Sequence, residues 1–178
     1  MPTSTGNPWD TIVGEAGRES ALWIAAARPA EEQEHEPVFS LLAEPRYALG
    51  VETIYEGYLL HYGKPRLFAP EDHDSALLLG DYLYAHGLVR IEQVGTVEAV
   101  NDLAELIAVC AYLQAEQIKG DASVWAATAA LLGEGALDDA RTSLRLDNDP
   151  GPLERLARGR AGDDAVERAL AAHAERLR

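Results

Sequence analysis

The stretch ALLLGDYLYAHGL, which runs from Ala76 to Leu88, predicts an apolar helix at the centre of this protein's fold. Its apolar residues cover most of the helix circumference, and such a helix belongs inside a bundle, not on its surface. Glycine in a helix costs ~1 kcal/mol relative to alanine, so we expect Gly80 to let a neighbouring helix approach closely. We expect Asp81 to be enclosed by apolar groups and therefore to need a hydrogen-bond or cationic partner.

The composition favours one all-α domain, a helical bundle over residues 1–178. Apolar residues make up 47% of the chain and aromatic residues only 7%, so its core is built from alanine, leucine and valine. An aliphatic core of this kind suits helices better than sheets. The formal charge of −15 disfavours nucleic acids and anionic membranes as partners.

The cysteine content and the lack of long apolar runs indicate where the protein is located and which cysteine-based sites it lacks. The single cysteine, Cys110, excludes an internal disulfide and a cysteine-based zinc site. The first residues lack a signal-peptide pattern, and no run approaches the roughly 20 apolar residues that a membrane span needs. We therefore expect a cytoplasmic protein with no membrane span.

Apolar spacing and Gly/Pro breaks divide the rest of the chain into further elements. Residues 1–8 are expected to be a mobile tail, and 28–36 an acidic, solvated connector. Residues 89–94 are expected to be exposed, and Asp102 to lie on a wet helix face. Helices are predicted over 10–27, 47–62, 97–117, 122–132 and 136–146, with a short helical piece over 37–44 and one or two helices over 152–178.

Several short motifs follow one another between Val51 and Leu132. They are Val51-Glu52-x-Ile54-Tyr55, Leu59-Leu60-His61, Gly63-Lys64-Pro65, Gly80-Asp81-Tyr82-Leu83 and Thr128-Ala129-Ala130-Leu131. In order and spacing they resemble the trans-polyprenyl diphosphate synthases, all-helical enzymes that join isoprenoid diphosphates. The resemblance implies a truncated isoprenoid-synthase-like core over 37–135, followed by divergent C-terminal helices over 136–178.

The charged motifs of that family are missing from this chain. Only Tyr62 separates His61 from Gly63, where the family has its first aspartate-rich motif and two arginines. Ala127 replaces a lysine, the acidic run EEQEHE replaces a basic segment, and no second aspartate-rich motif follows Gly135. In the family these acidic motifs hold the magnesium that bridges the substrate diphosphate. The resemblance therefore implies a catalytically inactive relative, a pseudoenzyme.

The face of residues 47–62 that would look into the family's cavity carries the candidate site. Glu52 and Glu56 lie one turn apart, and they either bind a cation or polar ligand or form a salt-bridged or solvated face. His61 is typical of a satisfied histidine at the core or its rim, whereas Lys64 could still meet a diphosphate. The candidates for lining the cavity or holding a ligand are Glu52, Tyr55, Glu56, Leu59, His61, Lys64, Asp81 and Tyr84.

Two further acidic groups need separate interpretation. The carboxylates of residues 71–74 resemble a metal site, but their place at a helix start explains them equally well. Asp138 and Asp139 begin a run that partly matches the metal motif of class I terpene cyclases. With Glu52 and Glu56 they could form a relocated magnesium site, the only circumstance in which we expect a cofactor.

Two classes of function follow from these patterns. The leading hypothesis is a non-catalytic scaffold that either binds a prenyl synthase subunit or a second copy of itself, or holds an apolar, isoprenoid ligand. The alternative is an active magnesium-dependent prenyltransferase or terpene-type enzyme that uses the relocated metal site.

Overall fold

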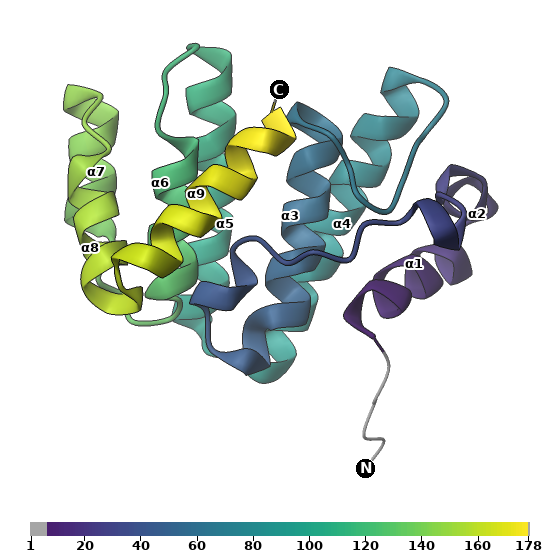
Figure 1. Ribbon diagram of the computed structural model, residues 1–178, viewed down its shortest axis with the longest axis horizontal. Helices are drawn as coiled ribbons and strands as arrows, with labels where there is room; N and C mark the ends of the chain where they lie inside the picture. Colours follow the sequence, from purple (N-terminus) through teal and green to yellow (C-terminus); the bar gives the residue numbers. More distant parts are fainter. Residues whose placement is uncertain (1–6, 178) are drawn as a thin grey trace.

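The computed structural model of this protein describes residues 7–177, which form nine α-helices, three short 3-10 helices and no β-strand. The predicted all-α helical bundle is therefore confirmed (Figure 1). Within this described range, no helix combines the length and the apolar character that crossing a membrane requires. The helices are α1 (Pro8–Glu19), α2 (Ala21–Ala26), α3 (Ala48–Tyr62), α4 (His73–Val94), α5 (Val97–Ala115), α6 (Asp121–Ala130), α7 (Asp138–Asp147), α8 (Gly151–Ala161) and α9 (Asp163–Leu177), and the 3-10 helices are Ala30–Glu32, Ser40–Leu42 and Pro45–Tyr47.

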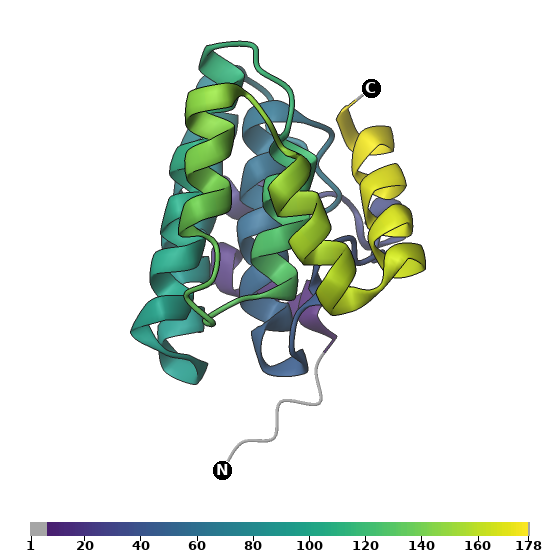
Figure 2. The same cartoon turned by 90° about the vertical axis from the view of Figure 1, so that its left-hand side faces the viewer.

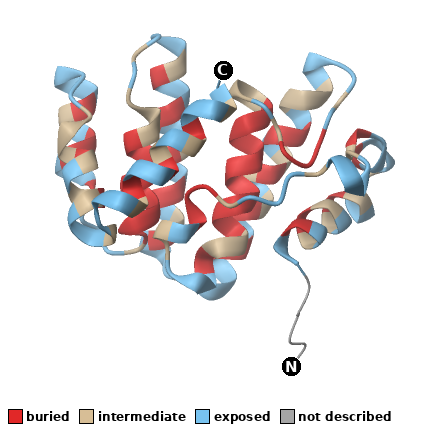
Figure 3. Cartoon of the chain, in the orientation of Figure 1, coloured by how far each residue is buried: buried red, intermediate tan, exposed pale blue. Residues whose placement is uncertain are grey.

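Helices α3 and α6 form the centre of the bundle, and nearly all of their residues are buried (Figure 3). Every residue of α3 from Gly50 to Leu60 is buried, including two glutamates. Helix α4 packs on α3 and α5 packs on α6, whereas α9 lies across the opposite side of the bundle (Figure 2). A helix buried on its whole circumference needs cover on every side, and these neighbours provide it.

Glycines set the close packing of α3 against α4. A Cβ atom added at Gly57 would lie 2.9 Å from the backbone oxygen of Gly80, and one added at Gly80 would lie 3.2 Å from the backbone oxygen of Gly57. Gly50 and Gly87 face each other in the same way one to two turns away. The expectation that Gly80 admits a neighbouring helix is therefore confirmed.

The N-terminal helices pack in a smaller apolar cluster against the outer sides of α3 and α4. Its buried members include Trp9 and Trp23. The single helix predicted over 10–27 is wrong, because Ser20 takes an extended conformation between α1 and α2 and caps α2 by accepting a hydrogen bond from the backbone of Leu22. Of the expected mobile tail, residues 1–6 lie outside the described part, whereas Asn7 caps α1 and Pro8 is the first residue of that helix.

The central helix is longer than the sequence predicted. Residues 89–94 continue α4 and are exposed as expected, except for Arg90 and Ile91, which are buried. The helix begins as expected, since Asp72 accepts a hydrogen bond from the backbone N–H of Ser75 at 2.7 Å. Thr96 caps α5 in the same manner.

Asp102, predicted to lie on a wet face, is instead buried and bound to α7. Its Oδ1 accepts a hydrogen bond from Arg141 at 3.1 Å, and its Oδ2 accepts one from the backbone N–H of Gly133 at 2.9 Å. This ion pair ties α5 to α7. The segment predicted over 152–178 as one or two helices forms two, because Gly162, with φ +89°, turns the chain between α8 and α9.

Candidate functional site

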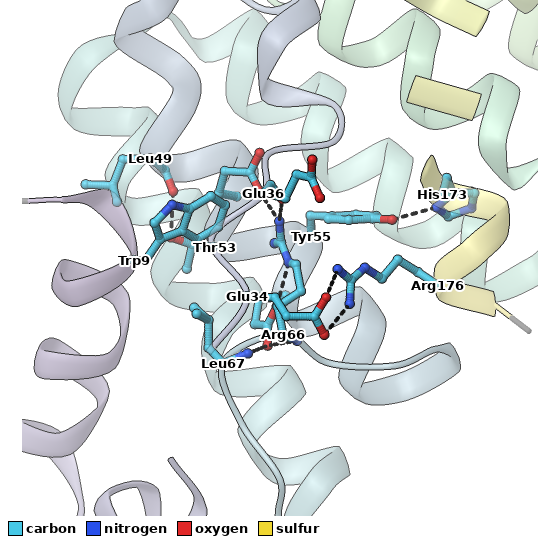
Figure 4. A network of polar contacts seen from close by, with 12 residues as sticks. Trp9, Glu34, Glu36, Leu49, Thr53, Tyr55, Arg66, Leu67, His173 and Arg176 are labelled. Carbon is cyan, nitrogen blue, oxygen red and sulfur yellow. Dashed lines mark hydrogen bonds and ion pairs between the residues drawn. The ribbon is translucent and has the colours of Figure 1, made fainter. Parts of the chain in front are cut away.

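A buried arginine organises the candidate residues of α3. Arg66 follows α3 in the connection to α4, and its side chain is wholly buried between Glu52 and Glu56. Its guanidinium lies 4.7 Å from the ring centre of Trp9 and 5.0 Å from that of Tyr55 (Figure 4). Trp9 belongs to the smaller apolar cluster around α1, and Tyr55 belongs to the main core around α3 and α6. The Arg66 side chain therefore joins these two apolar clusters.

Both carboxylate oxygens of Glu56 accept hydrogen bonds from the connection between α3 and α4. One carboxylate oxygen accepts hydrogen bonds from the backbone N–H groups of Arg66 and Leu67, at 2.8 and 2.7 Å. The other oxygen accepts one from Arg66 Nε at 3.1 Å. Burial alone would lower the pKa of Arg66, but the two carboxylates outweigh it and raise that pKa. Glu56 is therefore a structural acid that holds the chain reversal after α3.

Within the described part of the chain, only one of the two carboxylate oxygens of Glu52 has a hydrogen-bond partner. Its Oε2 accepts a hydrogen bond from Arg66 Nη1 at 2.7 Å. Its Oε1 is buried and has no hydrogen-bond partner among residues 7–177, and the same holds for Arg66 Nη2. Of the alternatives that the sequence left open for Glu52 and Glu56, a salt-bridged pair is what the fold forms, although one oxygen stays unused.

A second polar network surrounds Tyr55 on its other side. The hydroxyl of Tyr55 lies 2.8 Å from His173 Nδ1 of α9, and His173 Nε2 lies 3.0 Å from Asp121 Oδ2 of α6. Tyr58 donates to the same carboxylate oxygen at 2.5 Å and accepts from Gln114 at 3.1 Å. A Tyr–His–Asp chain can relay a proton, but here it joins α3, α6 and α9 inside the core.

Burial sets the protonation of this network. It raises the pKa of Tyr55 and of Tyr58, so both phenols stay protonated, and Tyr58 donates its hydrogen bond to Asp121. Burial by itself would also raise the pKa of Asp121, but the hydrogen bonds from His173 and Tyr58 outweigh it and lower that pKa. The network therefore combines two neutral phenols with a charged acid, Asp121, which Tyr58 contacts directly and Tyr55 reaches through His173.

Aromatic rings fill the space beside Tyr55. Phe39 stacks on Trp125 at 5.5 Å with an angle of 14° between their planes, and Tyr55 meets Trp125 edge to face at 5.0 Å. Tyr55, Phe39 and Trp125 are each exposed by 1% or less, as is Leu59. The region where the resemblance implies a cavity is occupied by close-packed side chains.

The remaining candidates lie apart from this centre. His61 Nε2 is 3.1 Å from Asp81 Oδ1, an ion-pair distance without hydrogen-bond alignment, and the His61 ring stacks on Tyr84 at 5.1 Å. Burial lowers the pKa of His61 although Asp81 opposes this. Asp81 itself is exposed, so the expected apolar enclosure is wrong, while its expected partner is present as His61. Lys64 is exposed and contributes only its backbone N–H, which donates to Arg176 at 2.9 Å.

The structure does not assemble the relocated metal site. Among residues 7–177, no three histidine, cysteine or acidic side chains come together in a group that could hold a metal ion. Glu52 and Glu56 are buried around Arg66, whereas Asp138 and Asp139 are exposed on α7. Asp72 is used as a helix cap. The four carboxylates that the alternative required therefore do not share one centre.

Sequence reasoning missed the residues that the structure pairs with the candidates. Arg66 lies in a segment interpreted only as a connector, yet it is an arginine followed by two large apolar residues, Leu67 and Phe68. Asp121 and His173 are 52 residues apart, and no local pattern connects them.

No protein-family model, no curated protein and no solved structure matches this chain. The resemblance to the prenyl synthases therefore rests on the motifs of residues 51–132 alone and stays a prediction.

Proposed function

We propose that this protein is a non-catalytic relative of the trans-polyprenyl diphosphate synthases that works as a helical scaffold by pairing with a second copy of itself. Three features support the proposal. They are the structural use of the acidic residues on α3, the aromatic filling beside Tyr55, and an outer face of α5 on which the exposed positions from Asn101 to Ala115 carry no charge. The last of these is the observation on which self-association depends.

The first two features bear on the absence of catalysis. Ionisation of an allylic diphosphate depends on opposing charge at the leaving group. Glu56 has both oxygens engaged by the chain after α3, and Glu52 shares its charge with Arg66. Tyr55 and Leu59 are packed without exposed surface. This arrangement suits a stable framework better than a cavity for a prenyl chain.

The outer face of α5 differs from the rest of the surface. Its exposed positions between Asn101 and Ala115 are Asn101, Ala104, Ala108, Ala111, Tyr112 and Ala115, and none of them is charged. Val97, at the start of α5, is 81% exposed. Helix α4, which packs on α5, also has Leu78 and Val89 at its surface, 61% and 49% exposed, together with the exposed acids Asp81 and Glu92. Exposed apolar and uncharged positions along one helix face are typical of a surface that meets another protein.

The charge of the chain favours a second copy as the partner. A chain with a formal charge of −15 repels its own copy wherever acidic surfaces meet, so self-association needs a neutral face. Alanines at 104, 108, 111 and 115 let two helix backbones approach closely. A basic partner would instead be expected to seek the acidic surfaces. The face of α5 is therefore best suited to its own counterpart across a two-fold axis.

Light scattering coupled to size exclusion tests the pairing. We expect a dimer that becomes tighter as salt rises from about 0.05 to about 0.5 M, because salt screens the repulsion between like-charged copies. Ala108→Glu should give a monomer with unchanged helical content. The matched control Ala171→Glu adds the same charge to an exposed site on α9 and should leave the dimer intact. A monomer at all salt concentrations would contradict self-association.

A separate assay tests the absence of catalysis. The purified protein is incubated with magnesium and with allylic plus homoallylic diphosphates, and prenyl products are measured. We expect no turnover. Turnover that Asp139→Ala abolishes would contradict the proposal and support an active enzyme.

A further inference from the structure

A pocket of about 360 Å³ lies between the start of α1 and the start of α3, on the far side of Glu52 from the aromatic core. Its volume falls at the small end of the range that holds small molecules, about 300 to 1,000 Å³. Its lining is mostly apolar and comes from two stretches that are distant in the sequence, residues 8–9 and residues 37–52. The lining residues are Pro8, Trp9, Pro37, Ser40, Leu41, Ala43, Pro45, Ala48 and Glu52.

Glu52 is the only charged residue in this lining. It is 2% exposed, and its Oε1 has no hydrogen-bond partner in the described part of the chain. A buried carboxylate oxygen without a donor is costly, and most buried polar groups are satisfied. The pocket therefore lies against a carboxylate with unused acceptor capacity, and a ligand reaches Oε1 by displacing the side chains that now cover it.

The charge around Glu52 decides what kind of donor fits. Glu52 and Glu56 share a single buried cation, Arg66, so the cluster carries one uncompensated negative charge. Glu56 has a donor on each of its oxygens, and the remaining acceptor capacity lies at Glu52 Oε1. A cationic donor would add both the missing hydrogen bond and the missing charge.

We propose that this pocket binds a small amphiphilic organic cation, a primary ammonium group carried on an aromatic or aliphatic body. The ammonium donates to Glu52 Oε1, and the body packs against Trp9, Leu41 and the proline rings of the lining. An anionic ligand such as a prenyl diphosphate is disfavoured, because it would meet the unpaired carboxylate. The inference goes beyond the proposed scaffold role and does not depend on it.

Titration with 2-phenylethylammonium, followed by NMR of the Trp9 indole N–H, tests this site. The resonance is identified from the spectrum of Trp9→Phe. We expect saturable binding of the ammonium compound and at least about tenfold weaker binding of its neutral analogue 2-phenylethanol, as expected for a lost hydrogen bond to a charged group. An allylic diphosphate should produce no saturable shift of this resonance. Equal affinity for the ammonium and the alcohol would overturn the proposal.

Three variants separate the role of the acid from that of the cavity. Glu52→Gln should weaken ammonium binding about ten- to hundredfold and leave the alcohol unchanged. Ala48→Leu fills the pocket without touching the buried charges and should abolish the binding of both compounds. Glu44→Gln, the matched control, removes an exposed charge beside the pocket and should leave both affinities unchanged. If Glu52→Gln does not fold, Ala48→Leu decides: unchanged ammonium binding in that variant would place the ligand elsewhere and overturn the proposal.

Discussion

Glu56 and Arg66 are joined twice, through the side chain and through the backbone. The carboxylate accepts hydrogen bonds from Arg66 Nε at 3.1 Å and from the backbone N–H of the same residue at 2.8 Å. Both residues are wholly buried. This relationship fixes how the chain leaves α3 and where it turns towards α4, so the stability of the fold should depend on it.

Arg66→Met should destabilise the protein by about 3 to 5 kcal/mol, because it leaves two buried carboxylates without their cation. The free energy of unfolding is measured by urea denaturation with circular dichroism. Arg46→Met is the control, since Arg46 forms an exposed pair with Glu44 and should cost less than about 1 kcal/mol. A cost for Arg66→Met as small as that of the control would show that the buried cluster does not stabilise the fold.

Gly57→Ala should destabilise the protein by about 1 to 3 kcal/mol, as expected for overpacking. The added Cβ would lie 2.9 Å from the backbone oxygen of Gly80, so the two helices must move apart. Gly14→Ala is the matched control, because a Cβ there meets nothing within 4 Å. It should stabilise α1 by about 0.5 to 1 kcal/mol. Thermal unfolding midpoints that move in the same direction for both variants would contradict this account.

The stabilising effect of Asp121 should disappear in acid. The hydrogen bonds of His173 and Tyr58 outweigh the effect of burial and hold the pKa of Asp121 below its usual 3.8. The unfolded chain therefore takes up the proton first as the pH falls. The stabilisation is complete above about pH 5 and is lost as the pH falls through about 4 towards the pKa of the folded state.

Urea denaturation of the native protein and of Asp121→Asn at several pH values measures this effect. The native protein should be more stable at pH ~6, and the difference should narrow by pH ~3. Asp164→Asn is the control, because Asp164 is exposed on α9 and should show a small difference at every pH. A gap between Asp121→Asn and the native protein that stays constant down to pH ~3 would contradict the predicted linkage.

Glu15→Gln should loosen α1 from α4. The Glu15 carboxylate lies 2.8 Å from His86 Nε2 and 2.5 Å from Arg90 Nη2, and Arg90 is 8% exposed. Removing the charge leaves a largely buried guanidinium without a counter-ion. Hydrogen exchange of the α1 amides should become about tenfold faster or more, while exchange in α6 stays unchanged.

Glu19→Gln is the control for this experiment, because Glu19 is an exposed acid on the same helix. It should leave the exchange of α1 unchanged. Equal effects of the two substitutions would show that the loss of any acid on α1, and not the contact with α4, governs its opening.

Much of the architecture follows from local patterns in the sequence. The helices over 47–62, 97–117 and 122–132 were predicted within a few residues, because apolar spacing and Gly/Pro breaks act within a few turns. The close approach at Gly80 was also predictable, since a glycine inside an apolar helix has few other uses. The break at Ser20 was not, because its side chain caps a helix of only six residues that packs against its neighbours.

The sequence by itself determined the all-α class, the positions of the main helices and the two acidic residues of α3, Glu52 and Glu56. Only the tertiary structure decided their partners. Arg66 pairs with Glu52 and Glu56 only because the chain reverses direction after α3. Asp121 contacts His173, which lies 52 residues further along the chain. Asp102 forms a buried ion pair with Arg141. The physical reason is that helix periodicity is a local property, whereas the burial of a charge depends on which distant side chain arrives to pair with it.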